Sequence, residues 1–229
     1  MESGNAPTTG RLSGTISALE VQARDQERVN LYLDGRFAFG LSAKMVADAG
    51  LKKGDHLSAD RISELLQGEA RERALQQAFN YLSYRPRSRQ EIERYLVQKG
   101  HAPETIEEVL RKLADYHYVD DQVFAVGWVE NRQRFRPTGP HLLRAELRQK
   151  GLDRALADQA ISDVMDDERA LALEAATKRA DSLKAVDYPE FSRKLGGFLS
   201  RRGFSGDVVW DVVRELWRRQ RGERAQIEE

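Results

Sequence analysis

The spacing of apolar residues divides the chain into a short β-rich part and a long helical part. Near the amino terminus apolar and polar positions alternate, most cleanly in the run Val29–Leu33. A period of two is typical of strands. Asp34-Gly35 follows at once and supplies the two positive-φ positions of a type I′ turn, so we expect a β-hairpin here. Residues 12–57 are therefore predicted to form a small β module.

Beyond the β module apolar residues recur every three or four positions, which is the period of amphipathic helices. The first helical stretch is expected to end before Arg85-Pro86, because proline pushes the residue before it out of the α region. Ser88 and Glu91 then match the capping box of a second helix. Gly100 is the residue type favoured just after a helix end, so we expect the second helix to stop there.

A unit of about fifty residues repeats three times in the helical part. The segment Leu96-Val97-Gln98-Lys99-Gly100 recurs 51 residues later as Leu147-Arg148-Gln149-Lys150-Gly151, and more loosely after another 52 residues as Leu199-Ser200-Arg201-Arg202-Gly203. Arg85-Pro86 likewise recurs as Arg136-Pro137. Because three short helices bury their apolar stripes poorly alone, stacked neighbours would share a core. We predict a mainly α fold, α+β overall, with three tandem three-helix repeats in an elongated curved array.

The predicted division of the chain has six parts. They are a disordered tail over residues 1–11, the β module over 12–57, helical repeats over 58–120, 121–165 and 166–219, and a flexible tail over 220–229. An array of stacked repeats presents a long surface. Such a surface suits a long partner, such as a filament or a nucleic acid, better than a small metabolite.

Charge changes this picture only when it is read along the chain. The 37 basic and 37 acidic residues cancel, which excludes a nonspecific cationic binder. Residues 71–150, however, carry 15 basic and 11 acidic side chains, and residues 193–221 carry 8 and 3. Residues 151–192 between them carry 5 basic and 10 acidic side chains. Two positive blocks thus flank an acidic one, a pattern that favours contact with DNA and an acidic protein surface together.

The candidate contact residues are basic and aromatic side chains at repeat-related positions. Guanidinium groups at turns can bind phosphates or carboxylates in pairs, and neighbouring rings can stack on bases. The same residues could instead form a solvated charged face, and cations at helix ends could simply offset the helix dipole. The candidates are Tyr84, Arg85, Arg87, Arg89, Arg132, Arg134, Phe135, Arg136, Lys150, Arg201 and Arg202.

No residue pattern in the sequence indicates catalysis or a bound cofactor. There is no cysteine, no P-loop, no glycine-rich dinucleotide turn and no nucleophile elbow. Asp120-Asp121 and Asp166-Asp167 precede helical patterns, where capping explains an aspartate better than metal binding does. We therefore expect a protein that is not an enzyme, with no metal and no cofactor. We also expect a cytoplasmic monomer, since no segment has the apolar length of a membrane span.

The three tryptophans invite a stacking interpretation as well. Trp128, Trp210 and Trp217 lie within apolar helical patterns. Packing in the core or between repeats explains large rings in such patterns better than a platform for bases does. We expect all three to be packing residues.

Five stretches in order resemble the RecX family of regulatory proteins, the bacterial modulators of the RecA recombinase. The likeness covers Glu69 to Arg219, and the order and spacing of the five stretches together make it specific. The stretches are Tyr81-Leu82-Ser83-Tyr84-Arg85-Pro86-Arg87-Ser88-Arg89-Gln90-Glu91, Tyr118-Val119-Asp120-Asp121 with Phe124-Ala125, Arg136-Pro137-Thr138-Gly139 with Leu143-Arg144-Ala145-Glu146-Leu147, Lys150-Gly151, and Arg202-Gly203-Phe204-Ser205.

The resemblance implies a partner and an activity. The implied partner is the RecA filament on single-stranded DNA, and the implied activity is non-enzymatic inhibition of its ATPase and strand exchange, which would modulate recombination, DNA repair and the SOS response. The β module is an extension that some members of the family have. The third repeat departs from the pattern because Tyr188-Pro189 stands where the others have Arg-Pro, so it need not duplicate their turns.

Two other functions remain open on the sequence. The helical units resemble helix-turn-helix elements, so the protein could be a helical repeat protein or transcription factor that binds nucleic acid directly. A steep fall of DNA affinity with salt would distinguish that class. The third possibility is a scaffold whose β module carries the specific partner.

Overall fold

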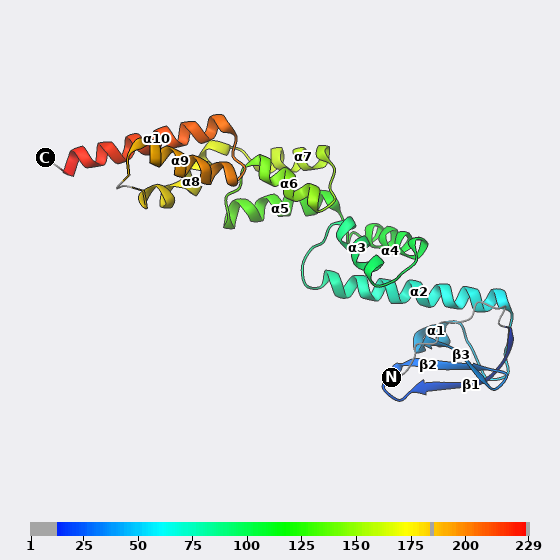
Figure 1. The fold of residues 1–229 in the computed structure, drawn as a ribbon. Coiled ribbons are helices and arrows are strands. Elements are labelled where there is room, and N and C mark those ends of the chain that lie inside the picture. Colours follow the sequence, from blue (N-terminus) through cyan, green and yellow to red (C-terminus); the bar gives the residue numbers. More distant parts are fainter. Residues whose placement is uncertain (1–12, 184–185, 228–229) are drawn as a thin grey trace. The chain divides into compact units, whose positions relative to one another are not determined.

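The computed structural model describes residues 13–183 and 186–227 of the chain (Figure 1). Within these residues the chain forms four strands, all near the amino terminus, and ten helices. Its contacts divide it into two compact units, residues 1–84 with 95–112 and residues 85–94 with 113–229. The predicted disordered tail over residues 1–11 lies outside the described residues.

The β module is a four-stranded antiparallel sheet in the order β3-β2-β1-β4. Its strands are β1 (Gly14–Gln22), β2 (Asp25–Leu33), β3 (Arg36–Ser42) and β4 (His56–Leu57), with the short helix α1 (Ala43–Asp48) between the last two. Asp34 and Gly35 have φ angles of 47° and 82°, so the predicted type I′ turn between β2 and β3 is confirmed. The inward-facing side chains of the sheet form its core with Ile62 and Leu65 of the next helix.

Helix α2 (Ala59–Leu82) is anchored to the sheet by a buried carboxylate. Glu69 accepts a hydrogen bond of 2.8 Å from the Arg28 guanidinium and another of 2.8 Å from the backbone N–H of Ser42. Both oxygens are therefore used, one by β2 and one by the end of β3. A buried carboxylate with a cation and a backbone donor avoids the cost of an unpaired buried charge.

The helix after α2 begins and ends where the sequence predicts. Helix α3 (Arg89–Gln98) begins with the predicted capping box, in which the N–H of Glu91 donates to Ser88 Oγ at 3.2 Å and the N–H of Ser88 donates to Glu91 Oε2 at 3.4 Å. Gly100 closes α3 with a φ of 82°, and the N–H of His101 donates to the carbonyl of Leu96. Helix α4 (Pro103–Asp115) follows directly.

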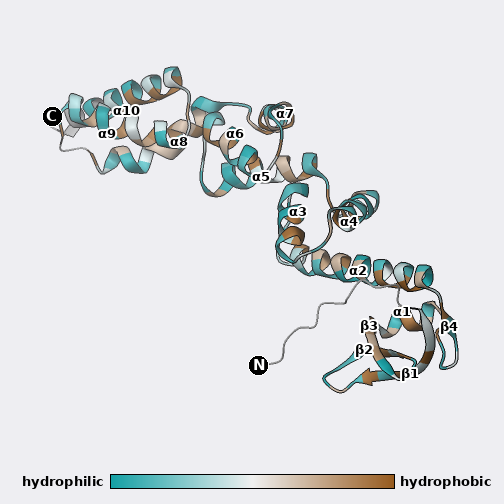
Figure 2. Ribbon diagram, turned by 45° about the vertical axis from the view of Figure 1, so that its right-hand side comes forward, coloured by the Kyte–Doolittle hydropathy of each residue, from teal (hydrophilic) through white to brown (hydrophobic). Residues whose placement is uncertain are grey.

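The remaining helices form two three-helix groups, each with its own core. The first group is α5 (Asp121–Phe135), α6 (Pro140–Gln149) and α7 (Arg154–Val164), and the second is α8 (Glu168–Asp181), α9 (Tyr188–Arg201) and α10 (Gly206–Ile227). Leu143 and Leu147 lie in the first core, and Leu195 and Leu199, their equivalents one repeat later, lie in the second. Figure 2 shows hydrophobic and hydrophilic residues alternating along single helices, as expected where one face is buried.

The mainly α fold, with three three-helix repeats after a small β module, is thus confirmed. Two local features differ from expectation. Helix α10 continues to Ile227, beyond the expected end of the helical repeats at residue 219. Helix α9 is 14 residues long against 10 for α6, and Pro189 lies in its first turn, so helix replaces the prolyl turn of the other repeats.

Adjoining repeats meet through the ends of their middle helices. Ser88, which precedes α3, donates a hydrogen bond of 2.5 Å from its hydroxyl to the carbonyl of Lys150 at the end of α6. One repeat later, Gly139 precedes α6 and its N–H donates to the carbonyl of Arg202, at the end of α9, at 2.8 Å. The carbonyl end of one helix therefore faces the amide end of another, and the two dipoles attract.

A glycine makes each of these helix-end joints possible. Gly151 and Gly203 have φ angles of 89° and 81°, values that favour glycine. A Cβ on Gly151 would overlap the side chain of Gln90, and one on Gly203 would overlap the backbone of Leu142. The basic-residue-glycine motif of the repeat is therefore both a helix stop and a contact surface for the preceding repeat.

Candidate partner-binding surface

Two aromatic rings project into solvent at equivalent places in the first and second repeats. Tyr84 follows α2 and is 85% exposed, and Phe135 ends α5 and is 70% exposed. Each stands directly before an arginine-proline pair. Arg136 leaves the helix with a φ of −154°, as its position before proline requires. Rings left in water in two repeats suit stacking on a partner better than packing in a core.

The arginines beside these rings fall into two groups. Arg134 and Arg136 are exposed, and the Arg134 guanidinium lies 5.2 Å from the centre of the Phe135 ring. Arg85 instead binds the Glu91 carboxylate with both terminal nitrogens, at 2.8 and 3.2 Å. Arg132 donates from Nε to Glu146 Oε2 at 2.8 Å. Of the arginines beside the two rings, Arg134 and Arg136 therefore present their charge to solvent, while Arg85 and Arg132 are held in place by carboxylates.

Glu91 is the hub of a three-residue charge cluster. Its carboxylate receives Lys150 Nζ at 2.7 Å in addition to Arg85, so two cations share one anion. Burial alone would raise the pKa of Glu91, but the hydrogen bonds and charges of Arg85 and Lys150 outweigh it and lower the pKa to about 2. The cluster retains an excess of positive charge at the joint between α3 and α6.

Trp128 connects this cluster to the core of the second repeat. Its indole N–H donates to Glu146 at 2.8 Å, and its ring stacks on Phe124 with centroids 5.9 Å apart. The cations of Arg132 and Lys150 lie 4.7 and 4.9 Å from the ring centre. Trp128 packs against the core of the second repeat, which confirms the predicted packing role, and it also orders two cations.

The other two tryptophans differ in burial: Trp217 is packed and Trp210 is exposed. Trp217 packs against the third repeat's core, 5.2 Å from the ring of Phe191, as predicted. Trp210 is 53% exposed on α10, so the prediction that it is a packing residue is wrong. Val209 and Val213 are buried on the face of α10 that packs against the core. Trp210 follows Val209 directly, and consecutive residues of a helix lie on different faces, so its side chain lies outside the packed face.

The remaining candidate cations lie at helix ends. Lys150 and Arg202 are the C-cap residues of α6 and α9, so their structural interpretation is supported. Arg202 also donates to the carbonyl of Pro137 at 3.1 Å, and burial together with the nearby Arg136 charge lowers its pKa. Arg201 is exposed in the last turn of α9. The N–H of Arg89 donates to the carboxylate of Asp121 at 2.8 Å.

One aspartate of each pair caps a helix. Asp120 accepts from the N–H groups of Gln122 and Val123, and Asp167 accepts from Ala170. This confirms the capping interpretation of both pairs. Among the described residues no group of three or more potential ligands is arranged to hold a metal ion, and no helix there is long and apolar enough to cross a membrane.

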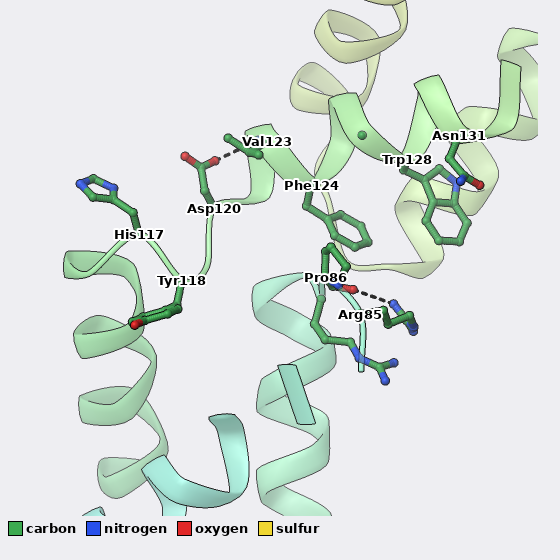
Figure 3. A pocket seen from close by; sticks show the side chains of 11 residues that line it. Arg85, Pro86, His117, Tyr118, Asp120, Val123, Phe124, Trp128 and Asn131 are labelled. Atoms are coloured by element: carbon green, nitrogen blue, oxygen red, sulfur yellow. Dashed lines mark hydrogen bonds between the residues drawn. The ribbon is translucent and has the colours of Figure 1, made fainter. Parts of the chain in front are cut away.

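A pocket that the sequence did not predict lies beside Trp128. It has a volume of about 640 Å³ and lies between the turn before α3, the segment that follows α4 and one face of α5. Figure 3 shows the rings of Phe124 and Trp128 pointing towards Pro86 and Arg85. Its lining comes from separate segments of the chain, so no local sequence motif predicts it.

Four stretches of the chain match described domains of one protein family. Residues 14–58 match the regulatory protein RecX N-terminal domain, and residues 74–113, 120–161 and 166–213 match the first, second and third three-helix domains of RecX. The three helical matches fall on the three groups of helices described above.

Individual proteins and structures agree with these matches. A "Regulatory protein RecX" of Bacillus pumilus (strain SAFR-032) is 34% identical over 206 residues, covering 88% of this chain and 77% of its own. One of Bacillus subtilis (strain 168) is 33% identical over 195 residues, covering 85% and 74%. A crystal structure of regulatory protein RecX superposes with a TM-score of 0.68 at 27% identity, over 89% of this chain and 100% of its own. One of RecX from Lactobacillus salivarius gives 0.60 at 27% identity, over 65% and 97%.

Proposed function

Because the chain belongs to the RecX family of regulatory proteins, we propose that it binds the RecA filament on single-stranded DNA and inhibits the filament's ATPase and strand exchange without chemistry of its own. Through this inhibition it would limit recombination and DNA repair and damp the SOS response. The partner's identity rests on family membership. The binding surface rests on the structure.

The observation that carries the proposed surface is an exposed ring that precedes an Arg-Pro pair in two successive repeats, with exposed arginines beside it in the second. Phe135 stands between Arg134 and Arg136, and Tyr84 occupies the equivalent place one repeat earlier. Stacking rings with adjacent guanidinium groups suit DNA bases and phosphates, and the same guanidinium groups suit carboxylates on a protein. A filament of protein on DNA presents both kinds of group at a regular spacing.

Inhibition follows from contacts that span neighbouring subunits. The ATPase of a filament depends on the interfaces between its protomers. A protein whose binding groups recur in successive repeats can contact more than one protomer at a time, and linked contacts bind more tightly than separate ones. Such bridging holds the interfaces in one arrangement and so slows turnover and strand exchange.

The alternative function, direct binding of nucleic acid, is favoured by the same rings and arginines. The two functions differ in their response to salt. A protein held mainly by phosphates loses affinity steeply as salt rises. We expect weak binding to naked single-stranded DNA and strong binding to recombinase-coated DNA at the same ionic strength.

A double charge reversal tests the proposal. Arg134→Glu with Arg136→Glu changes two exposed cations that lie next to Phe135. We expect the concentration needed for half-inhibition of the recombinase ATPase to rise at least about tenfold, the effect of roughly 1.4 kcal/mol. The matched control is Lys178→Glu with Arg179→Glu, which makes the same charge change on two exposed residues of α8. Equal inhibition by both variants would show that the surface is assigned wrongly.

A further inference from the structure

The pocket beside Trp128 has walls that suit an apolar group. Pro86 forms one side, and Val123, Phe124 and Gly127 of α5 form the other. Phe124 is only 8% exposed and so forms the floor, whereas Val123 is 69% exposed at the mouth (Figure 3). Gly127 leaves the middle of the wall bare, because a Cβ there would have no heavy atom within 4 Å.

The rim of the pocket is charged, and its excess is positive. Arg85 and Arg87 lie on one side. Glu91 holds Arg85 in place but also binds Lys150. One carboxylate is therefore shared by Arg85 and Lys150 and cannot neutralise both. On the opposite side Asp120 directs one carboxylate oxygen at the N–H groups that begin α5. A ligand that brings a carboxylate to the arginine side would complement the rim.

A nucleobase fits this pocket less well than a side chain does. A base needs an open aromatic face to stack on. Of the rings that line the pocket, Phe124 is nearly buried, Trp128 already has the cations of Arg132 and Lys150 over its ring, and Tyr118 is exposed, at 59%. A base would therefore find one open ring to stack on rather than a pair of rings to lie between. The exposed rings of Tyr84 and Phe135 provide the better stacking surfaces.

We propose that this pocket binds one large apolar side chain, aromatic or branched aliphatic, from a protein segment that carries a carboxylate beside it. The inference rests on the proposed function, since the segment is placed on the recombinase subunits of the filament. The pocket then supplies the protein-directed part of binding, and the exposed rings supply the part directed at DNA. A concave apolar site surrounded by polar or charged residues is the usual form of a binding hot spot in a protein interface.

Filling the pocket from its bare wall is the sharpest test. Gly127→Leu adds a branched side chain at a position where the Cβ meets no heavy atom within 4 Å, and the change favours the helix because leucine has a higher helix propensity than glycine. We expect binding to recombinase-coated single-stranded DNA, measured by fluorescence anisotropy, to weaken at least tenfold. Thermal stability should stay the same or rise. Gly127→Ala is the control, since it gives the same helix gain with one carbon and should change binding less than threefold.

Two further measurements, binding of the wild type to coated DNA and binding of Gly127→Leu to naked single-stranded DNA, distinguish three possible outcomes. If wild-type protein fails to bind the coated DNA, the proposed function and this proposal both fall. If wild type binds and Gly127→Leu binds equally well, the pocket is not the contact and only this proposal is overturned. If Gly127→Leu weakens binding to naked single-stranded DNA as strongly as to coated DNA, the occupant is a base and the proposal is also overturned.

The charge of the partner segment is tested at the mouth. Val123 is exposed, so its replacement leaves the core intact. Val123→Glu should weaken binding to the coated DNA at least fivefold more than Val123→Lys, because the added carboxylate repels the partner's own. Equal losses from the two variants would contradict the predicted carboxylate.

Discussion

The Ser88 hydroxyl joins two repeats because it accepts one hydrogen bond and donates another. It accepts the N–H of Glu91 at 3.2 Å, which caps α3, and it donates to the carbonyl of Lys150 at 2.5 Å, which ends α6. The side chain is fully buried. A single oxygen thus satisfies one amide at a helix start and one carbonyl at a helix end, two groups that helices leave unpaired.

Replacing Ser88 by alanine should therefore destabilise the protein more than the loss of an ordinary helix cap does. The change removes the capping acceptor and also leaves the Lys150 carbonyl without its donor in a buried place. We expect a loss of about 2–4 kcal/mol in the free energy of unfolding, the sum of a cap and an unmet buried acceptor. Urea denaturation followed by circular dichroism measures it. A loss near that of an exposed cap, such as Ser58→Ala before α2, would show that the joint adds little.

The three glycines of the repeat should differ in their tolerance of alanine. Gly100, Gly151 and Gly203 have φ angles between 81° and 89°, so each replacement pays the same backbone strain of about 1–2 kcal/mol. A Cβ on Gly100 meets nothing, one on Gly151 meets the Gln90 side chain, and one on Gly203 meets backbone. Gln90 can move, whereas the backbone cannot without shifting α6.

We accordingly expect Gly203→Ala to destabilise most, Gly151→Ala less and Gly100→Ala least. Overlap in a packed joint adds about 1–3 kcal/mol to the strain. Thermal melting of the three variants side by side gives the ranking, and Gly100→Ala serves as the internal control. An equal drop in Tm for all three would mean that the helix-end joints are loose enough to absorb a methyl group.

Acid should weaken the joint between α3 and α6 through Glu91. Its pKa in the folded protein is lowered from 4.5 to about 2. A lowered pKa means that the ionised form stabilises the fold, so the contribution is complete above pH 4.5 and is lost as the pH falls through about 2. Unfolding of wild type and Glu91→Gln should differ by a constant amount above pH 5, and the difference should shrink between pH 4.5 and 2. A difference independent of pH over that range would contradict the charge cluster.

The exposed rings should matter for binding and hardly at all for folding. Tyr84→Ala and Phe135→Ala remove side chains that are mostly in water, so we expect stability to change by less than about 0.5 kcal/mol. Affinity for recombinase-coated DNA should fall about tenfold for each, the size of one lost stacking contact. Trp210→Ala is the control, because Trp210 is exposed in the third repeat, outside the proposed surface. The same loss for all three rings would point to nonspecific apolar attraction.

The β module should loosen from α2 when Glu69 is shortened. Glu69→Ala leaves the Arg28 guanidinium without its carboxylate, though still bonded to the carbonyl of Gly40, and leaves the Ser42 N–H without its acceptor. We expect a destabilisation of about 3–5 kcal/mol, as for a buried ion pair that loses one partner. Hydrogen exchange at the Ser42 amide reports it directly. Arg28→Met keeps the stem but leaves the more buried Glu69 carboxylate without its cation, so it should also destabilise strongly, and a negligible cost for this variant would show that the charge pair matters little.

Local signals in the sequence predicted the ends of the elements well. The type I′ turn at Asp34-Gly35, the capping box of Ser88 and Glu91 and the glycine after α3 each depend on residues within a few positions of one another. Backbone geometry and near hydrogen bonds decide such features, so a single sequence suffices. The repeat was visible for the same reason, because equal local signals recur at equal spacing.

Contacts between distant segments were not predictable in the same way. Glu91 was recognised as a cap, but its ion pair with Lys150 joins residues 59 positions apart. Trp210 lies among the valines Val208, Val209, Val212 and Val213, which are buried or half-buried, yet the sequence does not say which face of α10 meets the core. His117 adopts a φ of 58° although it is not glycine, and it ends α4 and lines the pocket. Three-dimensional packing decides these features.

The joints between repeats have a consequence for how such a chain can evolve. Each joint consists of a carbonyl at one helix end, a glycine beside it, and a donor at the start of another helix. The carbonyl and the glycine are backbone features of both joints, whereas the donor is the Ser88 hydroxyl in one and the Gly139 N–H in the other. In-frame duplication of a whole unit would copy the carbonyl and the glycine unchanged. Gene rearrangement that alters the number of repeats therefore needs adaptation mainly at the donor side of each new joint.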